Sequence, residues 1–156
     1  MTIQTQYGTF LGAIALDKER RDRIDSAATR LSTYCTSDAQ IALYNPTLFF
    51  QGSYANDLAV RPADPKGEYD VDIVVLMSFA ANTSATAVLD WMSDRLALDP
   101  DYRSRIMPPK DKCVRLNYAG DFHVDVVPAH RATNDTGRIQ IPSRSSAGWL
   151  YSHHRG

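Results

Sequence analysis

The fold is decided by Phe49-Phe50-Gln51-Gly52-Ser53, which is followed after a polar loop by Glu68-Tyr69-Asp70-Val71-Asp72-Ile73-Val74-Val75-Leu76. These stretches predict a strand that ends in a Gly-Ser turn, and a second strand that carries two carboxylates two residues apart. Because side chains alternate between the two faces of a strand, Asp70 and Asp72 are expected on the same face. The apolar residues expected to pack on helices from the other face are Tyr69, Val71, Ile73 and Val75.

This arrangement indicates a particular chemistry. Two carboxylates at such a spacing repel one another unless a cation lies between them, and ligands that are all oxygen suit Mg²⁺, with Mn²⁺ as an alternative ion. The turn at Gly52-Ser53 offers backbone N–H groups and a hydroxyl to an anion. A metal ion beside a phosphate-binding turn points to chemistry on a nucleoside triphosphate.

The composition is that of a globular protein with one domain. The chain has 156 residues, of which 44% are hydrophobic and 22% charged, and this length suits one domain with a proper core. A formal net charge of −1 gives no indication of duplex nucleic-acid binding. No apolar stretch is long enough to span a bilayer and the N-terminus lacks a signal-peptide pattern, so we expect a cytoplasmic protein without a membrane partner. Cys35 and Cys113 form no motif and are expected to be reduced thiols.

Helical spacing predicts most of the elements that surround these strands. Residues 7–16 are expected to form a short helix, and a long helix is expected from Asp17, as its N-cap, to about Tyr34. Residues 36–46 are interpreted as a loop. Residues 84–98 predict another helix that stops at Asp99-Pro100, followed by a polar connector over residues 102–112.

A hairpin is predicted in the second half of the chain. Residues 113–118 and 122–128 are separated by Ala119-Gly120-Asp121, a plausible three-residue loop. In that register the facing pairs on the core side are all apolar: Tyr118 with Phe122, Leu116 with Val124, and Val114 with Val126. A two-residue loop would scramble this pattern. The other face then carries Arg115 opposite Asp125, with Asn117 and His123 beside them.

Three carboxylates on two neighbouring strands, next to a Gly-Ser turn, fit a two-metal site for phosphoryl or nucleotidyl transfer. Asp70, Asp72 and Asp125 are the predicted catalytic and metal-binding residues. The alternative for Asp125 is an ordinary ion pair with Arg115, which contributes little when exposed. The order of the three motifs favours the metal site, because acids beside core positions of two apolar strands need a reason to be there.

The chain resembles the polymerase-β-like nucleotidyltransferase superfamily, and in particular the cGAS/DncV-like cyclic-oligonucleotide synthases of CBASS antiphage defence. The matching motifs are Gln51-Gly52-Ser53-Tyr54, Tyr69-Asp70-Val71-Asp72-Ile73-Val74-Val75 and Phe122-His123-Val124-Asp125-Val126-Val127-Pro128-Ala129. The resemblance implies an α/β (α+β) fold with a palm-like mixed sheet of four to five strands backed by helices. It also implies that Asp70, Asp72 and Asp125 form the metal triad and that Gln51, Gly52 and Ser53 bind the donor nucleotide, ATP or GTP.

The same resemblance sets the expected domain organisation. Residues 1–142 would form the nucleotidyltransferase core with an N-terminal spine helix, and residues 143–156 a polar tail that leads towards a C-terminal helical lobe absent from this chain. A second copy or a partner subunit would then cover the surface that the lobe would cover. Three functions remain open: a cyclic-oligonucleotide synthase, a minimal nucleotidyltransferase acting on a protein or RNA, and a non-catalytic module that binds nucleotide and metal or a partner.

Overall fold

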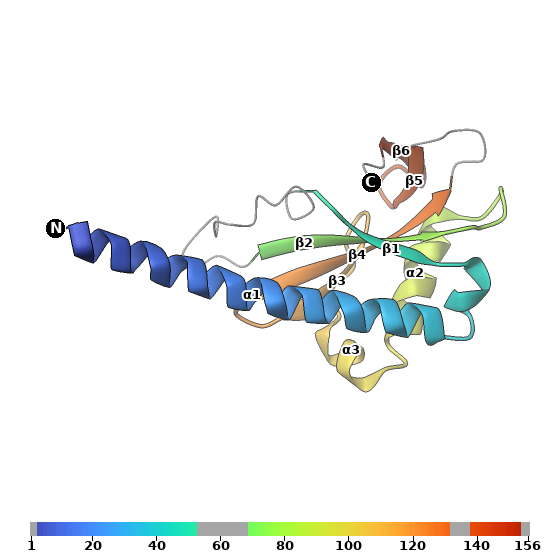
Figure 1. Ribbon diagram of the computed structural model, residues 1–156. Helices are drawn as coiled ribbons and strands as arrows, with labels where there is room; N and C mark the ends of the chain where they lie inside the picture. The colour runs from blue at the N-terminus through green and yellow to red at the C-terminus, as the bar shows by residue number, and fades with distance from the viewer. Residues whose placement is uncertain (1–2, 53–68, 132–137, 154–156) are drawn as a thin grey trace.

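The computed structural model describes residues 3–52, 69–131 and 138–153. A long helix crosses one side of a sheet, and shorter helices lie at one end of it (Figure 1). In chain order the elements are α1 (Ile3–Ser37), the 3₁₀ helix η1 (Ile41–Tyr44), β1 (Thr47–Gln51), β2 (Tyr69–Met77), α2 (Ala85–Leu96), α3 (Pro100–Arg105), β3 (Val114–Tyr118), β4 (Phe122–Arg131), β5 (Arg138–Ser143) and β6 (Gly148–His153).

Within the described residues the sheet is mixed and has six strands. Its order is β1-β2-β4-β5-β6, and β3 also pairs with β4. The central pair, β2 and β4, is parallel, whereas every other pair is antiparallel. The predicted α/β fold with a mixed sheet backed by helices is therefore confirmed, although the sheet has more strands than the expected four to five.

The register of the β3–β4 hairpin is the predicted one. Tyr118 faces Phe122 and Arg115 faces Asp125, so the three-residue loop interpretation is confirmed. Gly120 in that loop has a φ of +76°, a conformation that glycine adopts without a steric penalty. The loop is also tied to α1, because Arg20 and Arg23 both donate hydrogen bonds to Asp121.

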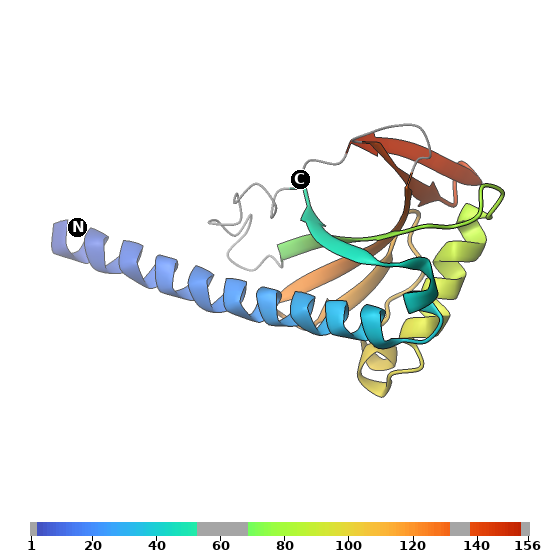
Figure 2. The same cartoon turned by 45° about the vertical axis from the view of Figure 1, so that its right-hand side comes forward.

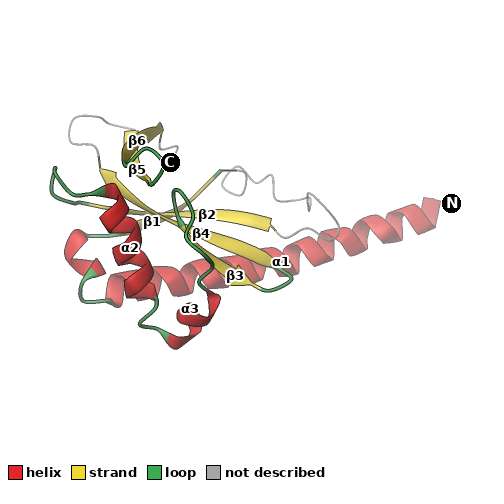
Figure 3. Ribbon diagram, turned by 180° about the vertical axis from the view of Figure 1, so that it is seen from behind, coloured by secondary structure: helices red, strands yellow, loops and turns green. Residues whose placement is uncertain are grey.

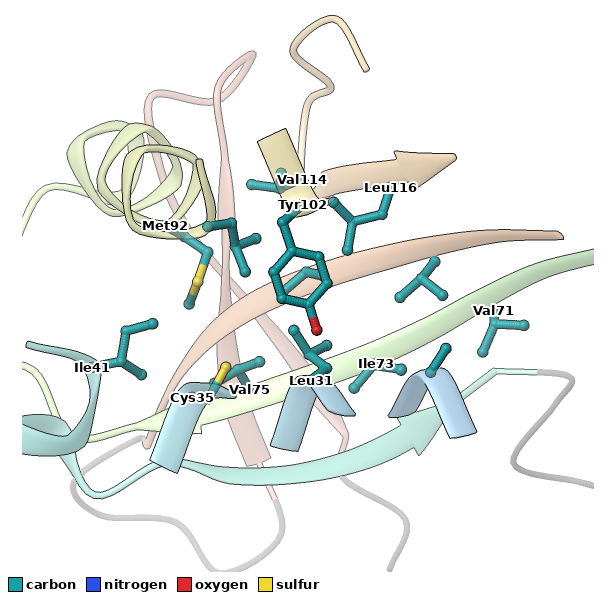
Figure 4. Close-up of a cluster of buried hydrophobic side chains, with 14 of the residues drawn as sticks. Leu31, Cys35, Ile41, Val71, Ile73, Val75, Met92, Tyr102, Val114 and Leu116 are labelled. Atoms are coloured by element: carbon teal, nitrogen blue, oxygen red, sulfur yellow. The ribbon is translucent and has the colours of Figure 1, made fainter. Parts of the chain in front are cut away.

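The face of the sheet towards α1 holds the main core. Val71, Ile73 and Val75 of β2 are buried against Leu31 and Cys35 of α1, and Figure 4 shows these side chains meeting beneath Tyr102 of the α3 segment. The prediction that the odd-numbered residues of β2 pack on helices is confirmed for these three. The even-numbered face of β2 is thereby left to carry Asp70 and Asp72.

A second apolar cluster covers part of that other face. It joins Val74 and Leu76 of β2 to Val127 and Ala129 of β4, with Ile139 of β5. The β5–β6 hairpin lies on the side of the sheet away from α1 (Figure 2). The face opposite α1 is thus apolar at the hairpin and polar at the N-terminal end of β2.

The N-terminal half of the chain corrects one expectation. α1 is one continuous helix from Ile3 to Ser37, not a short helix followed by a second one capped by Asp17. Asp17 lies inside this helix, and no proline interrupts the sequence there, so nothing forces a break. No helix in the described ranges is both long and apolar enough to cross a membrane.

Three other segments contain more regular structure than the sequence predicted. Residues 41–44 form η1 within the expected loop. α2 ends at Leu96 with Ala97 as its C-cap, two residues before the predicted stop. Asp99 instead caps α3, because its carboxylate accepts from the N–H groups of Asp101 and Tyr102. With Pro100 in its first turn, where a missing N–H does no harm, α3 occupies the start of the expected connector.

α2 and α3 lie beside the C-terminal half of α1 (Figure 3). Arg95 of α2 forms an ion pair with Asp38, just after the end of α1.

The expected polar tail is the third such segment. Residues 148–153 form β6 and pair with β5 along its length. Trp149 anchors this segment, because its Nε1 donates to the Thr83 carbonyl at 2.8 Å. The polar composition of the segment obscured a hairpin whose apolar residues are few.

We predict that the core on the α1 face supports most of the stability of the fold. Leu31→Ala should lower the free energy of unfolding by about 2–5 kcal/mol, because Leu31 is 1% exposed. The matched change Leu43→Ala, at a side chain 70% exposed, should stay within about 0.5 kcal/mol of the wild type. Urea denaturation measures both, and equal losses would contradict the assignment of this core.

Candidate active site

Asp70, Asp72 and Asp125 lie on one face of neighbouring strands. Asp72 of β2 is the direct partner of Asp125 of β4, and Asp70 is the partner of His123. Because β2 and β4 are parallel and in register, paired residues project from the same face. The three predicted acids are therefore brought together on this face. Their solvent exposure decreases from Asp70, which is exposed, to Asp125, which is 7% exposed.

The turn after β1 lies against the same acids. Gln51, the last residue of β1, pairs with Asp72. Gly52 follows with a φ of +78°, and a Cβ atom at this glycine would lie 3.3 Å from Asp72 Oδ2. Of the predicted nucleotide-binding residues, Gln51 and Gly52 thus border the acids, whereas Ser53 lies outside the described residues.

Arg115 and His123 contact the acids. Arg115 of β3 donates from Nε and Nη2 to the two oxygens of Asp125, at 2.7 and 2.9 Å, and its Nη2 lies 3.6 Å from Asp70 Oδ1. His123 Nδ1 lies 3.1 Å from Asp70 Oδ1. The ion pair considered as an alternative for Asp125 is therefore present. It lies within the cluster of the three acids, because Arg115 also approaches Asp70.

The charges of the cluster are unbalanced around Asp72. Burial, and then the neighbouring charges of Asp125 and Asp70, raise the pKa of Asp72 from 3.8 to about 6, against a lowering by Arg115. The hydrogen bonds and charge of Asp125 raise the pKa of Arg115, which stays fully protonated. A further positive charge near Asp72 would therefore favour its ionised form.

This imbalance gives a testable dependence of stability on pH. Since the pKa of Asp72 is higher in the folded than in the unfolded chain, the folded state binds more protons between about pH 4 and 6, and stability falls as pH rises through that window. Asp72→Asn should therefore stabilise the protein at pH 7 by about 2 kcal/mol in buffer without divalent cations, and by much less at pH 4.

Chemical denaturation at both pH values measures this difference. Asp94→Asn is the matched control, because Asp94 is exposed on α2 and its replacement should change stability by less than about 0.5 kcal/mol at either pH. A destabilised Asp72→Asn protein at pH 7 would contradict the repulsion between the carboxylates.

The donor set fits a hard divalent cation in its chemistry. Asp70, Asp72 and Asp125 offer only oxygen, which Mg²⁺ and Mn²⁺ prefer. Burial, and then the neighbouring carboxylates, raise the pKa of Asp72, so an added positive charge would favour its ionised form. In the described part of the chain, however, no three acidic, histidine or cysteine side chains are already closed into a metal-binding group. At Asp125 the guanidinium of Arg115 holds both oxygens.

Sequence reasoning did not find the part that β6 plays at the site. Ser152 accepts a hydrogen bond from Gln51 Nε2 at 3.4 Å, so β6 returns to the end of β1 and borders the acidic face. The signal for this was weak, because a serine in a polar segment has no distinctive pattern.

Cys113 also lies near the acids. Burial, followed by the charge of Asp125, raises the pKa of its thiol to about 12, which keeps the thiol protonated.

His130, near the end of β4, has an internal role. Its Nδ1 accepts from the Phe79 N–H at 3.1 Å, and its ring packs near Phe79 and Trp149. Burial lowers its pKa, so the neutral form that can accept this bond is favoured.

Known proteins share this architecture. The family model described as "Second Messenger Oligonucleotide or Dinucleotide Synthetase domain" matches residues 1–155. A c-di-GMP synthase of Roseivirga ehrenbergii is 31% identical over 147 residues, which are 92% of this chain and 39% of that protein. The chain therefore spans about two fifths of the length of this relative.

Solved structures agree on the fold. The CD-NTase CdnG of Bradyrhizobium diazoefficiens, in complex with GTP, matches with a TM-score of 0.62 and 24% identity over 92% of this chain and 39% of its own. CdnC of E. coli MS115-1, with ATP, matches with a TM-score of 0.63 and 20% identity over 89% of this chain and 42% of its own. The family predicted from the three sequence motifs is confirmed: this chain belongs to the Second Messenger Oligonucleotide or Dinucleotide Synthetase family of cGAS/DncV-like nucleotidyltransferases.

Proposed function

We propose that this chain carries the catalytic face of a Mg²⁺-dependent nucleotidyltransferase, which transfers a nucleoside monophosphate from a triphosphate to a hydroxyl and releases pyrophosphate. The observation that carries the proposal is the pairing of Asp72 with Asp125 on neighbouring strands, with Asp70 on the same face and the Gly52 turn against Asp72. Membership in the synthetase family supports the same reaction.

Each residue has a distinct role in this proposal. Asp70, Asp72 and Asp125 would hold the divalent cations, whose positive charge would neutralise the triphosphate and acidify the attacking hydroxyl. Asp125, the most buried of the three, would receive the proton of that hydroxyl. Gln51, Gly52 and Ser53 bind the donor nucleotide, and the absent Cβ of Gly52 leaves room beside Asp72.

The proposed product is a cyclic oligonucleotide second messenger, formed in the cytoplasm for antiphage defence. The relative in Roseivirga ehrenbergii is a c-di-GMP synthase, and solved relatives were obtained with GTP or ATP, which supports both nucleotides as substrates. Transfer to a protein or RNA acceptor is the alternative reaction.

The proposed domain organisation follows the family. Residues 1–142 would be the catalytic core, and residues 143–156 would lead towards a helical lobe. The β5–β6 hairpin spans this boundary, so the first part of the leading segment packs with the core.

Two measurements test the proposed function. Calorimetric titration with ATP and with GTP should show binding that requires Mg²⁺, and labelled triphosphates should yield pyrophosphate and a phosphatase-resistant cyclic product. Mg²⁺-dependent binding without turnover would support the non-catalytic module instead. Binding that is unaffected by loss of Asp70 and Asp72 would remove the acidic face from the function.

A further inference from the structure

Arg115 is placed at the centre of the acidic face. Its guanidinium holds both oxygens of Asp125, at 2.7 and 2.9 Å, and approaches Asp70 to 3.6 Å. The side chains of Arg115 and Asp125 are only 18% and 10% exposed, so water screens this pair far less than a surface ion pair. A two-pronged contact of this kind is among the stronger side-chain interactions.

This contact conflicts with metal binding at the same carboxylate. A dication bound at Asp125 would lie within a few ångströms of the guanidinium, and their repulsion grows as water is excluded. Among the described side chains no three acidic, histidine or cysteine residues form a closed group of metal ligands, although the three acids lie at adjacent sheet positions.

We propose that Arg115 is the resident countercharge of this face, and that Arg115 and a divalent cation compete for Asp125. The inference rests on the proposed function, because it takes Asp70, Asp72 and Asp125 as the metal ligands. Arg115 is a positioning residue here: it keeps the acids together while no metal is bound, and it must release at least part of Asp125 for the cation. The strength of the contact between Arg115 and Asp125 therefore sets the cation concentration at which the site fills.

Mn²⁺ binding to the protein without nucleotide tests the competition, with free Mn²⁺ counted by electron paramagnetic resonance. Arg115→Gln removes the charge and keeps a polar side chain of similar width, and should bind Mn²⁺ about tenfold more tightly than the wild type. Arg115→Lys keeps the charge but cannot make the two-pronged contact, and should lie between the two.

Arg105→Gln is the matched control for net charge. Arg105 pairs with Asp101 on α3 and lies over the Tyr118 ring, away from the acids, so this change should leave Mn²⁺ affinity within about twofold of the wild type. In an Asp125→Asn background most of the gain from Arg115→Gln should disappear, because the contested ligand is gone.

The outcomes separate this inference from the proposed function. Mn²⁺ binding that depends on Asp72 but is unchanged or weakened by Arg115→Gln overturns the competition and leaves Arg115 as a support that orients Asp125. Absence of Mn²⁺ binding in both the wild type and Arg115→Gln overturns the metal site as well. Thermal melting checks that each variant is folded. If Arg115→Gln is unfolded, the Mn²⁺ affinity of Arg115→Lys, compared with that of the wild type, decides instead.

Discussion

Replacing Asp70 and Asp72 together by Asn is expected to lower the rate of nucleotidyl transfer by on the order of a thousandfold or more. The change keeps the size of both side chains but removes two negative charges from the face where Asp72 pairs with Asp125. Without them a divalent cation has one carboxylate left, and Arg115 already holds that one. Release of labelled pyrophosphate from GTP or ATP measures the loss.

The fold should survive this double change, so the loss cannot be attributed to unfolding. Asp70 is exposed, and burial, followed by the charges of Asp125 and Asp70, disfavours the charged form of Asp72 and raises its pKa. We therefore expect a melting temperature without metal equal to or above that of the wild type.

Asp22→Asn/Asp94→Asn is the matched control for this experiment. It removes the same charge from exposed positions on α1 and α2, and should keep nearly full activity. Activity retained in Asp70→Asn/Asp72→Asn, or lost equally in the control, would refute the assignment of the acids.

The sequence was most informative where one face of a strand is buried. In β2 and in the β3–β4 hairpin, apolar and polar residues alternate, and a shift of one residue would bury the acids and expose the core. That constraint is why the partners of Arg115 and Tyr118 could be predicted. The pairing of β2 with β4 joins Asp72 to Asp125. The sequence itself predicted only that these acids lie on neighbouring strands, and the family resemblance supported this.

Elements fixed by distant contacts were harder to predict. β6 is recognisable by its pairing with β5 and by the contact of Trp149 with the Thr83 carbonyl, neither of which has a local signal. α1 continues through Asp17. A residue type that favours the N-cap starts a new helix only where its own backbone is non-helical. The hold of Arg115 on Asp125 was visible as a pair, but its approach to Asp70 depends on the twist and spacing of three strands.

Gly52→Ala is expected to lower nucleotidyl transfer by about 10- to 100-fold. The new Cβ would lie 3.3 Å from Asp72 Oδ2, closer than carbon and oxygen normally approach, so the carboxylate must shift by a few tenths of an ångström. Asp72 is the acid that lies between the turn and Asp125, and a small displacement there changes the position of every group that the site aligns.

The backbone at this glycine would also be strained, and a matched glycine separates that strain from the effect on the site. Gly52 and Gly120 have nearly the same φ, +78° and +76°, but a Cβ at Gly120 would meet no atom within 4 Å. Both alanine variants should therefore lose about 1 kcal/mol of stability, while only Gly52→Ala loses activity. Equal activity in the two variants would show that the space beside Asp72 is not needed, and that the glycine serves the turn alone.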